Sequence, residues 1–306
     1  MYIIKHVPED FIVTELSTIS PKEQGKYLYF KLWKKDYTTP EALRKIANAL
    51  HVSEKKFAYA GLKDRRSVTE QVCSVFGASK QKIDSITVES IKISVFGFGD
   101  DPVHVGDLKG NKFTVVVRNL ENIPEINSKF KNLFGEQRFS KNNAEVGKAL
   151  VKRDFKKAIE LIRVTDEQLI NSVELFVQKG EFLTALRKLP RKRLLLYIHA
   201  YQSKLWNETA ELSKEDLLPI VGFGSEVQDN ATKKILEREQ LTPRNFIINE
   251  FPELSVEGDV RKVWVEAKDV QLTVADDECF PGKKKATLHF FLPKGSYATE
   301  FIRQNF

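Results

Sequence analysis

Cysteine and histidine are scarce in this chain of 306 residues, with 2 and 5 copies. Cys73 and Cys279 lie far apart, so the sequence contains neither a disulfide framework nor a CxxC pair of the kind that binds zinc. The histidines show no HExxH or HxH spacing, and a His/Cys metal site would need ligands from distant segments. We therefore predict no bound metal and no catalytic thiol.

The glycine-rich turns that hold nucleotide cofactors are missing as well. Gly97-Phe98-Gly99 and Gly222-Phe223-Gly224 lack the third glycine of GxGxxG, and the sequence contains no GxxxxGK[ST]. The GxSxG motif of α/β-hydrolases is also absent. These absences predict a protein that works without a nucleotide or other small-molecule cofactor.

Long apolar runs are missing too. The longest unbroken one, Leu194–Ile198, is far shorter than the roughly 20 residues that span a bilayer. The stretch Met1–His6 carries a charge where a signal peptide needs its apolar core. We expect a cytoplasmic protein without membrane contact.

Charge of both signs is plentiful. The 49 Lys and Arg residues exceed the 42 Asp and Glu residues, which leaves a net charge of +7. That excess permits an anionic partner such as nucleic acid but does not require one. The length predicts two domains, or one domain with a large insertion.

Apolar/polar alternation predicts strands in the first third of the chain, at Phe11–Glu15 and Lys26–Leu32. A helix follows, with Thr39 as its N-cap and Pro40 in its first turn. Two more strands are predicted at 91–96 and 111–118.

Residues 143–211 have an almost wholly helical pattern, which includes one long helix at Arg191–Glu211. Asn230–Gln240 adds a short helix, and strand patterns return at Arg261–Glu266 and Ala286–Leu292. The order of strands, helices and strands predicts an α+β protein whose helical block is inserted into a sheet domain.

The segment Phe57–Gln71 is the most informative for chemistry, because one carboxylate, Asp64, lies among three cations. Lys63, Arg65 and Arg66 would keep Asp64 ionised and would attract a phosphate backbone. A carboxylate held in this way is a nucleophile or a base presented to a polyanion. Spacing alone favours the alternative, a surface turn with a Lys-Asp-Arg ion pair.

Two other segments suit RNA. Lys129–Phe139 interleaves aromatic residues with amides and cations, as in sites where an unstacked base lies on a ring; the alternative is a loop whose phenylalanines fill the core. A basic run begins the long helix, where phosphate contacts and a solvated helix face are equally good interpretations. Its cations are Arg187, Lys188, Arg191, Lys192 and Arg193.

Four blocks together resemble the TruD family of tRNA pseudouridine synthases, in a short, archaeal-type form. Pro8–Glu15 is similar to the family's PEDFxVxE stretch, and Gly61–Gln71 to its GxKDxxAxTxQ motif. Asn132–Phe139 is similar to NYFGxQRFG, and Leu292–Thr299, followed by Arg303, to LPxGSYATxxxR. The blocks occur in the family's order.

The resemblance implies an α+β fold in which a pseudouridine-synthase catalytic domain with a mixed antiparallel sheet (1–145 and 262–306) carries an inserted, mostly helical TRUD domain (146–261). It implies a monomer that flips a uridine out of tRNA, at position 13 in the D arm, and isomerises it to pseudouridine. No cofactor and no metal are expected. The alternative is a non-catalytic tRNA-binding protein or chaperone on the same fold.

The resemblance also assigns residues. Asp64 corresponds to the catalytic aspartate, Lys63 to the lysine beside it and Lys5 to a lysine before the PEDF block. Lys63 or Lys5 would neutralise and aim Asp64. Three residues are expected near the target base, Asn132, Phe134 and Tyr297, and four more on the substrate side, Arg65, Arg66, Gln71 and Arg138. The sequence leaves open whether Asp64 acts as a nucleophile or assists base detachment through a glycal-type route.

The chain departs from the family pattern at a few positions. Ser67 stands where alanine is usual, Leu133 where tyrosine is common, Ser140 where glycine follows QRF, and Gln304 where an acidic residue is common. Intact Asp64 and Lys63 favour an active enzyme over a degenerate one.

Overall fold

The computed structural model describes residues 1–306, apart from the side chains of residues 137, 140 and 141. The chain forms two compact units. Unit 1 comprises Met1–Lys129 and Glu266–Phe306, and unit 2 comprises Phe130–Val265. Unit 2 is therefore an insertion in the chain of unit 1.

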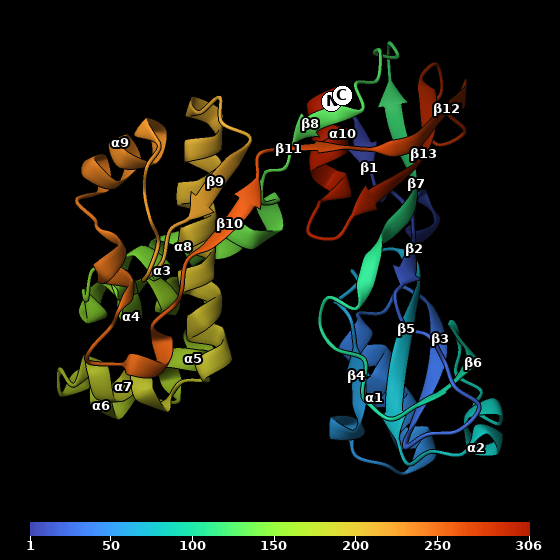
Figure 1. The fold of residues 1–306 in the computed structure, drawn as a ribbon, viewed down its shortest axis with the longest axis horizontal. Coiled ribbons are helices and arrows are strands. Elements are labelled where there is room, and N and C mark those ends of the chain that lie inside the picture. The colour runs from blue at the N-terminus through green and yellow to red at the C-terminus, as the bar shows by residue number, and fades with distance from the viewer. The chain divides into compact units, whose positions relative to one another are not determined.

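Unit 1 is built on a nine-stranded sheet with the order β12-β13-β7-β2-β5-β3-β6, to which β1 adds on β7 and β4 on β5 (Figure 1). All of its pairings are antiparallel except that of β2 with β5, so the sheet is mixed. Its strands are β1 (Ile3–Ile4), β2 (Phe11–Ser17), β3 (Tyr27–Lys35), β4 (Phe57–Tyr59), β5 (Val68–Phe76), β6 (Ile91–Gly99), β7 (Leu108–Leu120), β12 (Lys268–Asp276) and β13 (Lys284–Pro293).

Strands from the segments before and after the insertion meet in this sheet, because β13 pairs with β7 along most of its length. The chain ends also lie together in unit 1 (Figure 1), with the Tyr2 and Phe306 ring centroids 6.1 Å apart. The helices of unit 1 are η1 (Pro8–Asp10), α1 (Thr39–Leu50), η2 (Glu54–Lys56), α2 (Lys80–Asp84) and α10 (Ala298–Asn305). The α+β class expected from the sequence is confirmed.

The helix α1 packs on one face of β3. Leu28, Phe30 and Leu32 share that face because side chains alternate along a strand, and all three are buried against the apolar side of α1. The N-cap of α1 is Thr38, which forms a capping box with Glu41. The prediction of Thr39 as the cap was wrong, because the Thr39 hydroxyl is buried and bonds elsewhere.

Unit 2 is mostly helical. Its helices are η3 (Glu136–Asn142), α3 (Asn143–Val151), α4 (Phe155–Thr165), α5 (Glu167–Asn171), α6 (Glu174–Gln178), α7 (Phe182–Lys188), α8 (Arg191–Leu212), α9 (Asn230–Glu239), η4 (Pro243–Phe246) and η5 (Pro252–Leu254). The long helix α8 packs closely on α3, where a Cβ on Gly147 would lie 2.0 Å from the Tyr197 carbonyl oxygen. Only glycine allows this approach of the two backbones.

The chain leaves unit 1 within β8 (Lys129–Lys131) and returns within β11 (Trp264–Glu266), and these two strands pair. The sequence placed the domain boundaries after residue 145 and before residue 262, whereas the units divide at 129/130 and 265/266. The predicted strand at 261–266 is two strands, because β10 (Asp259–Lys262) pairs with β9 (Leu217–Ile220). Among the helices of the described chain, none is long and apolar enough to cross a membrane.

Candidate active site

Asp64 lies on the segment 61–67 that links β4 to β5, with its side chain 43% exposed. The Lys5 ammonium donates to Asp64 Oδ2 at 2.5 Å. Lys5 follows β1 in the left-handed region, with φ of 56°, and its ammonium lies 4.3 Å from the centroid of the Phe11 ring. Non-glycine residues adopt this conformation only where surrounding structure holds it. Two segments far apart in sequence thus form one carboxylate–ammonium pair, in which the carboxylate is exposed and the lysine is partly buried.

Lys63 does not pair with Asp64. Its ammonium donates to Glu15 Oε2 at 2.6 Å, and both side chains are buried. The other oxygen of Glu15 accepts from Val72 N at 3.2 Å. Of the two lysines expected to neutralise and aim Asp64, Lys5 pairs with it, whereas Lys63 pairs with Glu15. Lys63 instead joins the segment to β2 and β5.

The backbone of the same segment is held by two buried polar side chains. Thr39 Oγ1 accepts from Lys63 N at 3.0 Å and donates to Gln71 Oε1 at 2.8 Å. Gln71 Nε2 donates to the Gly61 carbonyl at 2.9 Å. We expected Gln71 to contact the substrate, but both ends of its amide bond within unit 1. The sequence did not predict this support of the backbone by Thr39 and Gln71.

Two side chains donate hydrogen bonds to the Asp64 carbonyl. It accepts from Ser67 Oγ at 2.8 Å and from the Lys34 ammonium at 2.9 Å, and Lys34 also donates to the Tyr37 carbonyl at 2.5 Å. Burial lowers the pKa of Lys34 to about 8. Sequence reasoning missed Lys34, although it lies two residues beyond Leu32 on the buried side of the strand.

The two arginines after Asp64 bond elsewhere. Arg65 pairs with the Glu41 carboxylate, and Arg66 donates to the His6 carbonyl at 2.5 Å. The ion pair within the motif, which spacing alone favoured, is not formed among the described side chains. Arg66 instead connects the segment to the residue after Lys5. Both guanidinium groups belong to exposed residues beside the carboxylate.

The first sequence block is anchored by a buried charge cluster. Asp10 accepts twice from Arg118 on β7, at 2.9 and 2.8 Å, and Arg118 also donates to Asp277 at 2.9 Å. Asp10 in turn accepts from Val7 N at 3.1 Å. The turn that follows Lys5 is therefore fixed to the sheet.

In unit 2, Phe134 is 8% exposed. Its backbone exchanges two hydrogen bonds with the Asn207 amide on α8, at 2.8 and 2.9 Å. Its ring meets Trp206 edge-on at 5.6 Å between centroids, and the Arg261 guanidinium lies 4.1 Å from the ring centroid. The ring thus already has aromatic and cationic neighbours, and Arg261 is a neighbour that the sequence did not suggest.

Asn132 is buried next to the same group. Its N–H donates to the Val263 carbonyl at 2.7 Å, and its carbonyl accepts from Arg261 at 3.0 and 2.7 Å. Its side-chain oxygen has no hydrogen-bond partner among the described atoms. Arg138 Nε donates to Ser203 Oγ at 3.2 Å, and its guanidinium lies 5.6 Å from the Phe134 ring. The block therefore packs against α8 with Phe130 and Phe134 buried, as expected of a loop whose phenylalanines fill the core.

The remaining predicted base contact, Tyr297, belongs to unit 1. It immediately precedes α10 and is partly exposed. Its unit also holds Lys5, Lys63 and Asp64, whereas Asn132, Phe134 and Arg138 belong to unit 2.

The basic run was expected to begin the long helix, but Arg187 and Lys188 end α7 and only Arg191, Lys192 and Arg193 begin α8. Its arginines bond within unit 2. Arg187 and Arg191 donate to the carbonyls of Glu250 and Glu253, at 2.7 and 3.0 Å. Arg193 pairs with Asp166 at 3.2 Å. The exposed lysines of the run are Lys188 and Lys192. These lysines are better suited than the arginines to the expected phosphate contacts.

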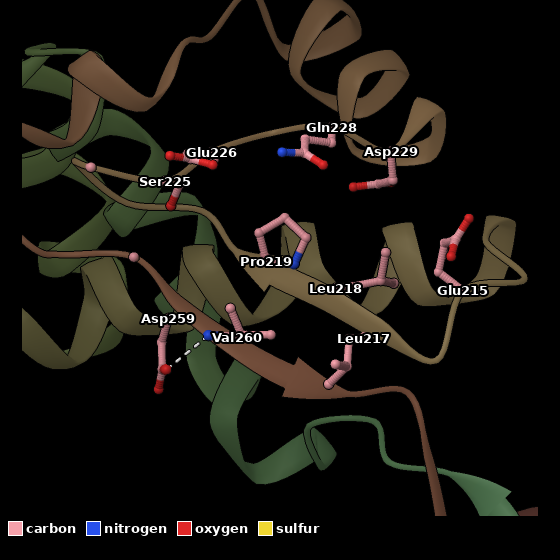
Figure 2. A pocket seen from close by; sticks show the side chains of 12 residues that line it. Glu215, Leu217, Leu218, Pro219, Ser225, Glu226, Gln228, Asp229, Asp259 and Val260 are labelled. Atoms are coloured by element: carbon pink, nitrogen blue, oxygen red, sulfur yellow. Dashed lines mark hydrogen bonds between the residues drawn. The ribbon is translucent and has the colours of Figure 1, made fainter.

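A cavity of about 690 Å³ in unit 2 has the wrong charge for RNA. Figure 2 shows Glu226 and Asp229 on one side of it, Asp259 and Val260 on the other, and Glu215 at its end. The residues that line it include four carboxylates and neither Lys nor Arg, so it repels phosphates. These carboxylates form no metal site, since nowhere in the described chain do three His, Cys, Asp or Glu side chains gather suitably.

The buried pair of Lys63 and Glu15 gives a stability prediction. Lys63→Met leaves the Glu15 carboxylate buried without its cation, which we expect to lower the free energy of unfolding by about 3–5 kcal/mol. Urea unfolding followed by circular dichroism measures the change. The double variant Lys63→Met/Glu15→Gln should recover part of the loss. A single-variant loss below about 1 kcal/mol would contradict a structural role for the pair.

The chain is similar to known proteins over nearly its whole length. The family model described as tRNA pseudouridine synthase D (TruD) matches residues 2–168 and 215–305. The chain is 27% identical to a "Probable tRNA pseudouridine synthase D" of Methanosarcina mazei, over 97% of this chain and 91% of that protein. It is 28% identical to the "tRNA pseudouridine synthase D" of Aquifex aeolicus, over 99% and 97%. A crystal structure of a putative TruD from Methanosarcina mazei superposes with a TM-score of 0.75 at 27% identity, covering 99% of this chain and 92% of that one.

Proposed function

The chain belongs to the TruD family of tRNA pseudouridine synthases, and on this premise we propose that it isomerises the uridine at position 13 in the D arm of tRNA, with Asp64 as its catalytic group. The reaction breaks the N1–C1′ bond, rotates the uracil and forms a C5–C1′ bond. The C5 hydrogen leaves as a proton and N1 gains one. Because the balance needs no oxidant, reductant or group donor, we propose that no cofactor takes part.

The observation that carries this proposal is the Lys5–Asp64 pair. The carboxylate is exposed enough to meet a nucleoside, and the Lys5 ammonium 2.5 Å away holds it in position through a charge-assisted hydrogen bond. The sequence left two routes open, and both require an ionised carboxylate in a fixed position. It can add to the nucleoside as a nucleophile, or it can assist detachment of the base.

A uridine inside a helical stack is out of reach, so we propose that the enzyme flips it out. Phe134 and Tyr297 are our candidates for the aromatic contacts with the uracil, and Asn132 for a hydrogen bond to its edge. The unpartnered Asn132 side-chain oxygen supports the last role. Arg261 and Arg138, both close to the Phe134 ring, supply cations for the adjoining phosphates.

We propose tRNA as the partner, the cytoplasm as the location and a monomer as the acting form. Arg65 and Arg66 lie exposed beside Asp64 and are suited to phosphate contacts there. Lys188 and Lys192 offer a second place for such contacts, on unit 2.

The direct test is to incubate the protein with a tRNA transcript and map pseudouridine by chemical modification and primer extension. We expect one new pseudouridine, in the D arm at position 13. A transcript with cytidine at that position should show none. Wild-type protein that binds the transcript but forms no pseudouridine would overturn the proposal and favour a tRNA-binding protein without catalysis.

Lys5→Met tests the ion pair. We expect the single-turnover rate to fall by roughly 10²-fold, because the carboxylate loses the charge that orients it. The affinity for tRNA should change little, since one cation is removed. Lys5→Arg should retain part of the activity, and Lys22→Met, which removes an exposed lysine paired with Asp100, serves as the control. A Lys5→Met rate within twofold of wild type would argue against this role.

A further inference from the structure

Lys34 is a lysine where the pattern of the strand calls for an apolar residue. It continues the row Leu28, Phe30 and Leu32 on the buried face of β3, and its side chain is 0% exposed. Burying an ammonium costs far more than burying an aliphatic side chain, unless hydrogen bonds and opposite charge compensate for it. Such a residue in a core therefore requires an explanation.

The hydrogen bonds of Lys34 explain why a lysine is tolerated in the core. Its ammonium donates to the carbonyls of Tyr37 and Asp64, at 2.5 and 2.9 Å. The Asp64 carbonyl also accepts from Ser67 Oγ at 2.8 Å. Two donors on one carbonyl restrain rotation of the peptide unit between residues 64 and 65. A restrained peptide unit limits the positions open to the Asp64 Cα atom, and so limits where its carboxylate can lie.

Burial and the charges around Lys34 set the pKa of its ammonium. The carboxylates of Asp64 and Glu41 favour its protonated form, while burial and the Lys63 ammonium oppose it. Burial is the largest of these effects, and the pKa falls to about 8. Lys34 is thus protonated at neutral pH and loses its charge in mildly alkaline solution, where its hydrogen bond to Asp64 weakens.

We propose that Lys34 is a positioning residue for the isomerisation, which holds the Asp64 backbone from inside the sheet and thereby aims the carboxylate. This inference rests on the proposed function. Lys34 does not touch the substrate, because it is buried beneath the segment 61–67. Its effect should appear in the chemical step and not in tRNA binding.

Lys34→Met keeps the length and volume of the side chain but removes the donor. We expect a single-turnover rate at saturating enzyme that is roughly 10–100-fold lower at pH 7, with a tRNA dissociation constant within twofold of wild type. Lys31→Met is the matched control, since Lys31 lies exposed on the same strand. A Lys34→Met rate equal to that of the control would overturn the inference.

The pH profile separates positioning from a merely structural role. Between pH 6 and 10 the wild-type rate should fall above about pH 8, and Lys34→Met should lack this decline. A slower variant that retains the wild-type decline would contradict the inference. Wild-type protein that forms no pseudouridine at any pH would instead refute the proposed function.

A second variant covers the case in which Lys34→Met does not fold. Ser67→Ala removes the other donor to the Asp64 carbonyl, so the segment then depends more on Lys34. We expect its rate to drop more steeply from pH 7 to pH 9 than the wild-type rate. An equal or smaller drop would count against Lys34 as the positioning residue.

Discussion

Asp64→Asn should give a folded protein that still binds tRNA but releases no tritium from uridine labelled at C5. The amide has the shape of the carboxylate but is neither a nucleophile nor a base. We expect the rate to fall by at least about 10³-fold, the scale reached when a catalytic nucleophile or base is removed. The fold should tolerate the change because the side chain is 43% exposed.

Two measurements accompany this test. Circular dichroism and tRNA binding show whether fold and affinity are retained, and Asp100→Asn, at an exposed carboxylate of the same unit, provides the control. Loss of the Lys5 pair is a smaller effect, which the Lys5→Met variant measures separately. Tritium release by Asp64→Asn at more than a few per cent of the wild-type rate would exclude Asp64 as the catalytic group.

Arg118→Met should cause the largest loss of stability. Arg118 is buried and binds two buried carboxylates, Asp10 and Asp277. Removing the cation leaves both carboxylates in the interior without compensation, which we expect to cost about 3–5 kcal/mol or more. Because Asp10 also holds the turn after Lys5, the Lys5–Asp64 pair should loosen at the same time.

Urea unfolding measures this loss. Arg44→Met is the matched control, since the Arg44–Glu54 pair is exposed and its removal should leave stability near that of wild type. Stability should also decline at acid pH in the wild type, because Asp277 has a pKa below its usual value in the fold: burial opposes the shift, and backbone hydrogen bonds and Arg118 outweigh it. An Arg118→Met variant as stable as the Arg44 control would contradict the buried cluster.

Local sequence patterns predicted the strands and helices in which apolar residues recur with a regular spacing. β3 alternates and is buried on one side, and α8 begins at Arg191 as its helical pattern indicated. The central strand β5 was missed because it is buried almost throughout and does not alternate. β12 was missed for the opposite reason, since nearly all of it is exposed.

The sequence could not predict which cation pairs with the Asp64 carboxylate. Lys5, Lys63, Arg65 and Arg66 were all plausible partners for Asp64, yet only Lys5 pairs with it among the described side chains. Neighbouring residues in a sequence point in different directions once the backbone is folded. Distance along the chain therefore says little about which cation reaches a given carboxylate.

The sequence by itself determined the family, the α+β class, the absence of cofactor motifs and the carboxylate that we propose as the catalytic group. These follow from residue types and spacings that are local in the chain. Only the tertiary structure decided that Lys63 is a buried support, that Gln71 and Thr39 hold a backbone, and that Lys34 lies beneath Asp64. Those roles depend on burial and on contacts between distant segments, which exist only after the sheet has brought β2, β3 and β5 together.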